Sequence, residues 1–180
     1  MNALVGAALL ALCIGSRDMI PAVTSAQRDV ALSAAFVFNF AKFTEWPGLP
    51  AGAPIVACVF GDDGIATALA DTVRGQNISG HAIDVRSAKD DGEFRSCQLL
   101  FVGAAEVRRL QTALAGISAL PVLTVSDAAG FSKTGGIIEI YVEDGRMRFA
   151  INVKAVERSG LHISPRLLNL AKIVRDRHVP

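Results

Sequence analysis

The chain has 180 residues, which is enough for one domain with a well-packed core. Hydrophobic residues make up 51% of the sequence and charged residues 19%, a balance that excludes an intrinsically disordered chain. The formal net charge is +1, from 18 basic and 17 acidic residues, so no excess of positive charge indicates a nucleic-acid partner.

The N-terminus is an uncharged apolar segment. Residues 3–14 are too few to span a bilayer, but they have the length of a signal-peptide core. Small residues precede the expected cleavage site after Ala26, although Arg17 and Asp18 interrupt the approach to it. No Lys or Arg precedes the apolar run, and a buried N-terminal helix is the alternative interpretation. We therefore predict a signal peptide at residues 1–26, a single domain at residues 27–180, and export to the periplasm.

Residues 29–45 have the pattern of an amphipathic helix. Asp29 is the expected N-cap, and Pro47 ends the helix just after Trp46. We expect the aromatic residues of this segment to form core rather than a stacking site for a ligand. The residues spaced along one helical face are Leu32, Phe36, Phe40 and Phe43.

Strands and helices then alternate along the chain. Apolar runs predict buried strands at residues 55–60, 98–102 and 122–125, and a weaker strand at residues 82–85. Residues 65–73 and 104–114 predict the helices between them. Such alternation is typical of a parallel sheet with helices on its faces.

The C-terminal part has a different pattern. Residues 137–142 and 146–151 predict a β-hairpin, with Gly145 at the turn position that needs a positive φ. A terminal helix is expected to open with Ser164 as N-cap and Pro165 in its first turn. The fold class is therefore α/β, a single compact domain whose mostly parallel sheet is flanked by helices and followed by a hairpin and a terminal helix. The apolar stripe of that helix is Leu167, Leu170, Ala171 and Val174.

No catalytic set emerges from the motifs. Asp62 and Asp63 follow the first buried strand, where a receiver domain holds a metal ion, but residues 99–103 offer no phosphoacceptor, so we expect a helix cap. Ser126 and Asp127 are likewise expected to cap a helix rather than form a nucleophile. The protein is predicted to be no enzyme and to use no metal or cofactor. Its scattered histidines, none at metal-ligand spacing, are His81, His162 and His178.

Two cysteines remain after removal of the leader that contains Cys13. An even pair, Cys58 and Cys97, indicates a disulfide in an exported chain. Closing a loop of about 40 residues stabilises a fold by roughly 4 kcal/mol on the chain-entropy model. A C-x-x-C motif is absent, so a structural bridge is favoured over a redox switch.

Several short motifs, in a fixed order, give the chain a family resemblance. The motifs that carry the resemblance are Trp46-Pro47, Ala57-Cys58-Val59-Phe60-Gly61, Cys97-Gln98-Leu99-Leu100-Phe101, Leu123-Thr124-Val125-Ser126-Asp127, Gly130-Phe131, Gly135-Gly136-Ile137-Ile138, Phe149-Ala150-Ile151-Asn152, Gly160-Leu161-His162-Ile163-Ser164 and Leu167-Leu168-Asn169-Leu170-Ala171. With these motifs, the chain resembles the YfiR family of periplasmic regulators across nearly all of residues 30–174.

The resemblance implies an exported α/β protein that represses an inner-membrane diguanylate cyclase by binding its periplasmic part. It implies that an outer-membrane OmpA-like lipoprotein can sequester the repressor, which raises cyclic-di-GMP and promotes biofilm formation. It also implies a homodimer and matches Cys58–Cys97 to a disulfide of the type protein. That protein has a second cysteine pair, whereas this sequence has no cysteine after Cys97, so redox control through the second pair is not expected.

The expected partner-binding segment is residues 160–166, at the start of the last helix. It combines apolar residues that look exposed, Leu161 and Ile163, with the polar His162 and Arg166. The open alternative is that the two apolar residues are ordinary core.

The rival function is a periplasmic small-ligand sensor that acts on another membrane sensor. A ligand would bind at the carboxyl ends of the parallel strands, where such sheets hold their ligands. Polar contacts would come from Asn152, Arg175 and Arg177, although a solvated helix end explains the arginines more simply.

Overall fold

The computed structural model describes residues 24–90 and 92–175. Most of the expected signal peptide, Arg177 and His178 lie outside the described residues. In the described part, no helix is both long and apolar enough to cross a bilayer.

The helices are α1 (Ser25–Lys42), α2 (Asp63–Val73), α3 (Val107–Ile117), α4 (Val153–Ser159) and α5 (Pro165–Leu168), with 3-10 turns η1 (Glu93–Ser96), η2 (Ala104–Glu106) and η3 (Phe131–Thr134). The strands are β1 (Thr44–Glu45), β2 (Ile55–Phe60), β3 (Asn77–Ile78), β4 (His81–Ala88), β5 (Leu99–Val102), β6 (Leu123–Ser126), β7 (Ile138–Glu143), β8 (Arg146–Asn152), β9 (His162–Ile163) and β10 (Lys172–Val174).

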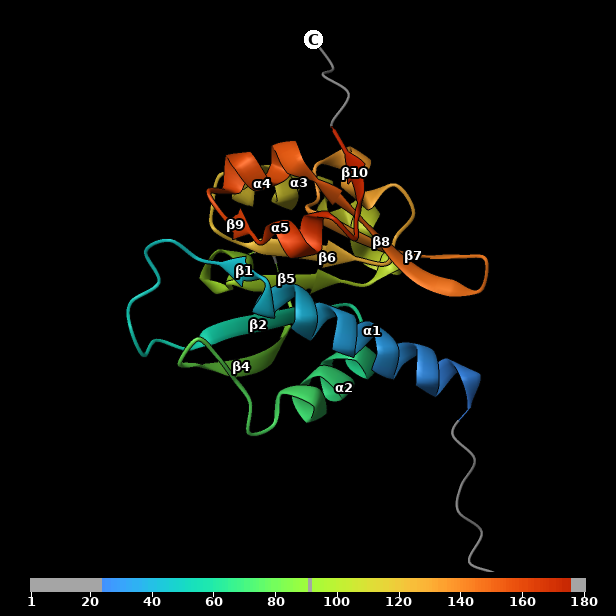
Figure 1. Ribbon diagram of the computed structural model, residues 1–180, viewed down its shortest axis with the longest axis horizontal. Coiled ribbons are helices and arrows are strands. Elements are labelled where there is room, and N and C mark those ends of the chain that lie inside the picture. Colours follow the sequence, from blue (N-terminus) through green and yellow to red (C-terminus); the bar gives the residue numbers. More distant parts are fainter. Residues whose placement is uncertain (1–23, 91, 176–180) are drawn as a thin grey trace, which may run out of the picture.

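A central sheet of eight strands has the order β10-β8-β7-β6-β5-β2-β4-β3 (Figure 1). Its middle part, from β4 through β2, β5 and β6 to β7, is parallel, as the alternation of strands and helices predicted. The hairpin β7–β8 and the short strand β3 pair antiparallel with their neighbours. The predicted fold class is therefore confirmed.

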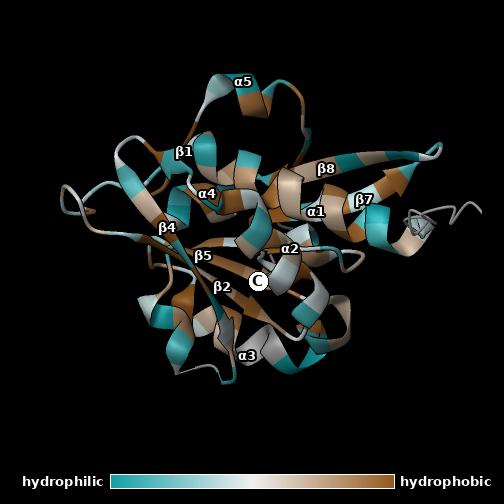
Figure 2. Ribbon diagram, turned by 90° about the horizontal axis from the view of Figure 1, so that it is seen from below, coloured by the Kyte–Doolittle hydropathy of each residue, from teal (hydrophilic) through white to brown (hydrophobic). Residues whose placement is uncertain are grey.

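Helical elements cover both faces of this sheet. On one side, called the α1 face, residues of α1, α2 and α5 pack on the strands, and Phe40, Leu69 and Leu167 are buried there. The opposite side, called the α3 face, is covered by α3, η1 and η3, whose buried residues include Phe94 and Phe131. Figure 2 shows that the central strands β2 and β5 are predominantly hydrophobic, as strands covered on both faces must be.

The hairpin has the predicted glycine conformation. Gly145 has a φ of 68° and Asp144 a φ of 52°. Positive φ at both central residues of a two-residue loop matches the right-handed twist of the paired strands. The tip of the hairpin projects from the sheet on the side where α1 begins (Figure 1).

Helix α1 begins earlier than predicted. Thr24, and not Asp29, is its N-cap, and the Thr24 hydroxyl accepts a hydrogen bond of 3.2 Å from the Gln27 backbone N–H. The Gln27 side chain accepts in return from the Thr24 backbone N–H at 3.0 Å. This reciprocal capping box satisfies two backbone donors, which a cap at Asp29 would not do.

The terminal helix is shorter than its apolar stripe indicated. Ser164 caps it as predicted, accepting from the Arg166 backbone N–H at 3.3 Å, but the helix ends at Leu168. Residues Lys172–Val174 instead form β10, parallel to β8. Of the predicted stripe only Leu167 is buried, at 4% exposed, whereas Leu170 is 75% exposed. Pairing with the free edge of β8 gives the backbone of this segment the hydrogen-bond partners that a longer helix would otherwise supply.

Candidate interaction surface

The predicted partner segment is held in a second, two-stranded sheet. Strand β9 pairs antiparallel with β1, placing Ile163 beside Thr44 and His162 beside Glu45. Two further hydrogen bonds hold this sheet in place. The Ser164 backbone N–H donates to the Phe43 carbonyl at 2.8 Å, and the Thr44 hydroxyl donates to the Phe40 carbonyl at 2.8 Å. The end of α1 and the start of α5 are thereby joined, although they are far apart in the sequence.

The apolar residues of this segment are not exposed. Leu161 is 3% and Ile163 is 9% exposed, and both belong to the core on the α1 face. The expectation that they form an open apolar surface was wrong, because side chains alternate along β9 and the residue before it, which turns Leu161 and Ile163 inward. A change of Leu161 to a charged residue would disrupt the core, so it cannot report on partner binding.

The polar residues of the segment do lie at the surface. The side chains of His162 and Glu45 are 71% and 83% exposed, and His162 Nδ1 lies 3.9 Å from Glu45 Oε2. Arg166 is exposed on the first turn of α5. We call these three residues the β1–β9 surface. Buried neighbours hold its backbone in place, so polar groups are presented to solvent on a fixed frame.

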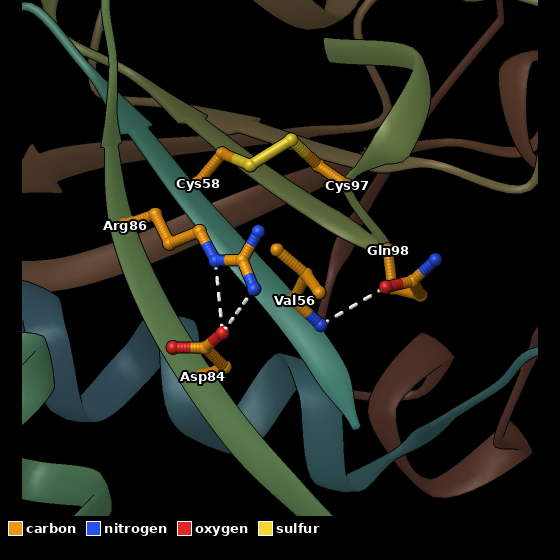
Figure 3. A network of polar contacts seen from close by, with 6 residues as sticks. All are labelled: Val56, Cys58, Asp84, Arg86, Cys97 and Gln98. Carbon is orange, nitrogen blue, oxygen red and sulfur yellow. Dashed lines mark hydrogen bonds and ion pairs between the residues drawn. A yellow bond between two sulfur atoms is a disulfide. The ribbon is translucent and has the colours of Figure 1, made fainter. Parts of the chain in front are cut away.

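A chain of contacts links this surface to the disulfide. Trp46 directly follows β1, and its indole N–H donates to the carbonyl of Gln98 at 2.8 Å. The Gln98 side chain in turn accepts from the Val56 backbone N–H at 2.9 Å (Figure 3). The predicted disulfide between Cys58 and Cys97 is present, with the two Cα atoms 5.9 Å apart. No sequence pattern indicated that the single Trp would bridge to the residue next to Cys97.

A small cavity lies beside the same surface. It has a volume of about 170 Å³. The ring of His81 is engaged there, since its Nδ1 lies 2.7 Å from the carbonyl oxygen of Ala53. Pockets for drug-sized ligands have volumes of about 300–1,000 Å³, so this cavity suits only a very small molecule. Its lining comprises Thr44, Glu45, Trp46, Leu49, Ile55, Ile78, Ser79 and His81.

The predicted ligand contacts have other roles. Asn152 is fully buried, its side-chain oxygen accepts from the backbone N–H groups of Lys154 and Ala155, and its amide donates to the Ser132 carbonyl at 2.7 Å. It is the N-cap of α4, and these bonds direct its side chain into the core, so its contact with a ligand stays a prediction. Arg175 is exposed and directly follows β10, whose last residue Val174 pairs with Asn152.

The carboxyl ends of the parallel strands form a crowded edge. Asp62 caps α2 as predicted, accepting from the Ile65 backbone N–H at 2.9 Å. A Cβ on Gly103 would lie 2.8 Å from the Gly61 carbonyl oxygen, so only glycine permits these two loops to approach so closely. Loss of surrounding water raises the pKa of Asp127, and the negative charge of Asp62 raises it further, against the lowering effect of two backbone hydrogen bonds.

Ser126 does not cap a helix as expected. Its hydroxyl donates to the Val102 carbonyl at 2.6 Å and accepts from the Ala128 backbone N–H at 3.1 Å, so it joins β6 to β5. Throughout residues 24–90 and 92–175, no three His, Cys, Asp or Glu residues come together as a metal-binding group.

Comparison with known proteins decides the family. Residues 30–172 match the model of a family described as YfiR/HmsC-like. The chain belongs to this family. The YfiR/HmsC-like family is a regulatory one, periplasmic and associated with the control of a diguanylate cyclase, which agrees with the disulfide observed here.

One solved structure is similar in outline. It is described as a conserved domain protein from Vibrio cholerae O1 biovar El Tor strain N16961, with 11% identity and a TM-score of 0.47. The match covers 80% of the present chain and 59% of the Vibrio chain.

Proposed function

We propose that this YfiR/HmsC-like protein is exported after cleavage of residues 1–26 and acts in the periplasm by binding the periplasmic part of an inner-membrane diguanylate cyclase. Binding would repress the cyclase and thereby lower cyclic-di-GMP and biofilm formation. The observation that carries this proposal is the family match over residues 30–172. A regulator of this kind shifts its target only by binding the inactive arrangement more tightly than the active one.

The β1–β9 surface is the proposed contact. It offers charged and polar groups, Glu45, His162 and Arg166, on a backbone fixed from below by Leu161 and Ile163. Preorganised polar groups lose little conformational entropy on binding, which favours a specific complex. By family resemblance, the protein is further proposed to form a homodimer and to be sequestered by an outer-membrane OmpA-like lipoprotein.

Co-purification with the periplasmic part of the cyclase tests the contact. The double variant His162→Asp and Arg166→Glu should bind about tenfold more weakly, equivalent to ~1.4 kcal/mol, as expected for loss of a polar interface group. Arg74→Glu is the matched control, because the Arg74 side chain is 79% exposed at the C-terminal cap of α2 and is not part of this surface. Unchanged binding of the folded double variant would remove this surface from the proposal.

The alternative is a periplasmic small-ligand sensor, and the cavity beside Trp46 and His81 favours it. Its volume of about 170 Å³ lies below the range of typical ligand sites, and the residues first expected to bind a ligand do not line it. Mass spectrometry of natively purified protein separates the two functions. A small molecule retained at equimolar amount would support the sensor.

A further inference from the structure

The outer edge of β4 lacks a partner strand over most of its length in the described part of the chain. Within residues 24–90 and 92–175, β3 pairs with β4 only at His81 and Ala82, whereas β2 occupies the inner edge from Ile83 to Ala88. Alternate backbone N–H and C=O groups of residues 83–88 therefore point out of the sheet. Such an edge is a template on which another strand can add.

The charges on this strand determine which second strand it accepts. Asp84 and Arg86 stand two residues apart, so they share one face of β4, and Asp84 Oδ2 lies 2.5 Å from Arg86 Nη2 (Figure 3). Both side chains retain solvent exposure, 43% for Asp84 and 59% for Arg86. A copy of β4 running parallel and in register would set like charges opposite each other. A copy running antiparallel can set each charge opposite its counterpart.

One antiparallel register satisfies both the charges and the available length. About a twofold axis through Val85, Asp84 of each copy faces Arg86 of the other, within reach of a cross-strand pair. On the opposite face of the sheet, the two Val85 side chains meet, and Ile83 faces Ser87. This register uses residues 83–87, the stretch that begins where β3 stops at Ala82.

We infer that the protein forms a twofold dimer by antiparallel pairing of β4 with β4 of a second copy across residues 83–87. The two sheets become one continuous sheet, closed by a self-complementary contact of the kind that C2 dimers use. The inference rests on the homodimer included in the proposed function, and it is independent of which membrane protein the dimer binds.

Sedimentation or light scattering of the mature, disulfide-bonded protein tests this dimer. Wild type should have the mass of a dimer, whereas Asp84→Arg alone and Arg86→Asp alone should each raise the dimer dissociation constant by roughly tenfold to a hundredfold, because like charges then face each other. An equimolar mixture of the two variants should regain the dimer, since two arginines of one chain would face two aspartates of the other. Asp71→Arg is the control, because Asp71 forms a similar exposed pair with Arg74 on α2, and it should keep the wild-type mass.

Further outcomes decide against the inference. A wild-type monomer at every accessible concentration would overturn it, and so would charge variants that remain dimeric. The doubly exchanged chain, Asp84→Arg with Arg86→Asp, keeps opposite charges paired both within one strand and across the two strands. It should therefore be a dimer. If the single variants are monomeric and this double variant is also monomeric, another surface forms the dimer.

The mass measurement contains no cyclase, so the two proposals fail separately. A wild-type dimer dissociated by Asp84→Arg, yet without affinity for the cyclase, would leave this inference standing and overturn the proposed function. A monomer that binds the cyclase would overturn this inference and the proposed homodimer, and would leave the proposed repression of the cyclase standing.

Discussion

The two faces of the central sheet are held together in different ways. On the α1 face, helices α1 and α2 lie across the strands, and buried aromatic rings such as Phe40 and Phe149 pack with centroids 5.0 Å apart. On the α3 face, one helix and short 3-10 turns cover the strands, and the Cys58–Cys97 bond lies within that core. The comparison indicates that side-chain packing stabilises the first face, whereas the second depends in part on a covalent link.

Phe40→Ala should give the largest effect, on the α1 face. Phe40 is 1% exposed and packs against Phe36 and Phe149, so truncation should lower the free energy of unfolding by about 3–5 kcal/mol. Urea denaturation followed by the fluorescence of the single tryptophan measures the loss. Leu32→Ala on the same helix is the control, since Leu32 is 45% exposed, and it should change stability by only about 0.5 kcal/mol. Equal losses in the two variants would contradict a packed α1 face.

Removal of the disulfide tests the α3 face. The bond joins residues 39 apart in sequence, so the double variant Cys58→Ala and Cys97→Ala should lose roughly 4 kcal/mol on the chain-entropy model. Denaturation with and without a thiol reductant provides the check. The reductant should shift wild type to the midpoint of the variant and leave the variant unchanged. If reduced and oxidised wild type unfold alike, the covalent link contributes nothing to this face.

Asn152→Ala should weaken the junction between the two faces. Asn152 caps α4, which contributes Ala155 to the α1 face, and donates to Ser132 of η3 on the α3 face. Loss of a buried cap and of this donor should lower stability by about 2 kcal/mol. Thermal denaturation of Asn152→Ala beside Ser164→Ala, which removes an exposed cap, gives the comparison. A smaller loss of stability for Asn152→Ala than for Ser164→Ala would show that the hydrogen bonds of Asn152 do not hold the two faces together.

Asp127→Asn should give the smallest effect on stability. Asp127 lies at the edge of the sheet where the carboxyl ends of the parallel strands meet. Because the folded protein raises the pKa of Asp127 above 3.8, it binds that proton more tightly than the unfolded chain does. Wild type therefore loses stability as the pH rises from 3.8 through the raised pKa, a loss that asparagine does not have. The variant should be more stable at neutral pH by a few tenths of a kcal/mol, within about 0.5 kcal/mol, and the gain should vanish in acid. A difference that does not change with pH in melting experiments would refute this.

Much of the sheet could be predicted because local patterns decide it. The apolar runs of β2, β5 and β6 and the turn glycine Gly145 need no distant partner to be recognised. The family could also be predicted, since its motifs recur in a fixed order. The structure of the terminal segment could not be predicted, because Lys172–Val174 becomes a strand only by pairing with the free edge of β8.

The candidate surface was harder to predict than the fold. His162 and Arg166 are exposed as expected, but the inward orientation of Leu161 and Ile163 depends on pairing between β9 and the distant β1. Asn152 looked like a ligand contact because a polar residue at a strand end has the same sequence pattern as a helix cap. Only the position of η3 shows where its amide donates.

The Cys58–Cys97 bond closes a covalent ring that contains α2, β3, β4 and η1. A protease that cuts the exposed turn at Gly75 or Gln76 would leave both fragments attached to each other. On a denaturing gel, the nicked chain would migrate as one species and resolve into two bands only after treatment with a thiol. Digestion in an oxidising compartment could therefore pass unnoticed in any assay that reads only the size of the chain.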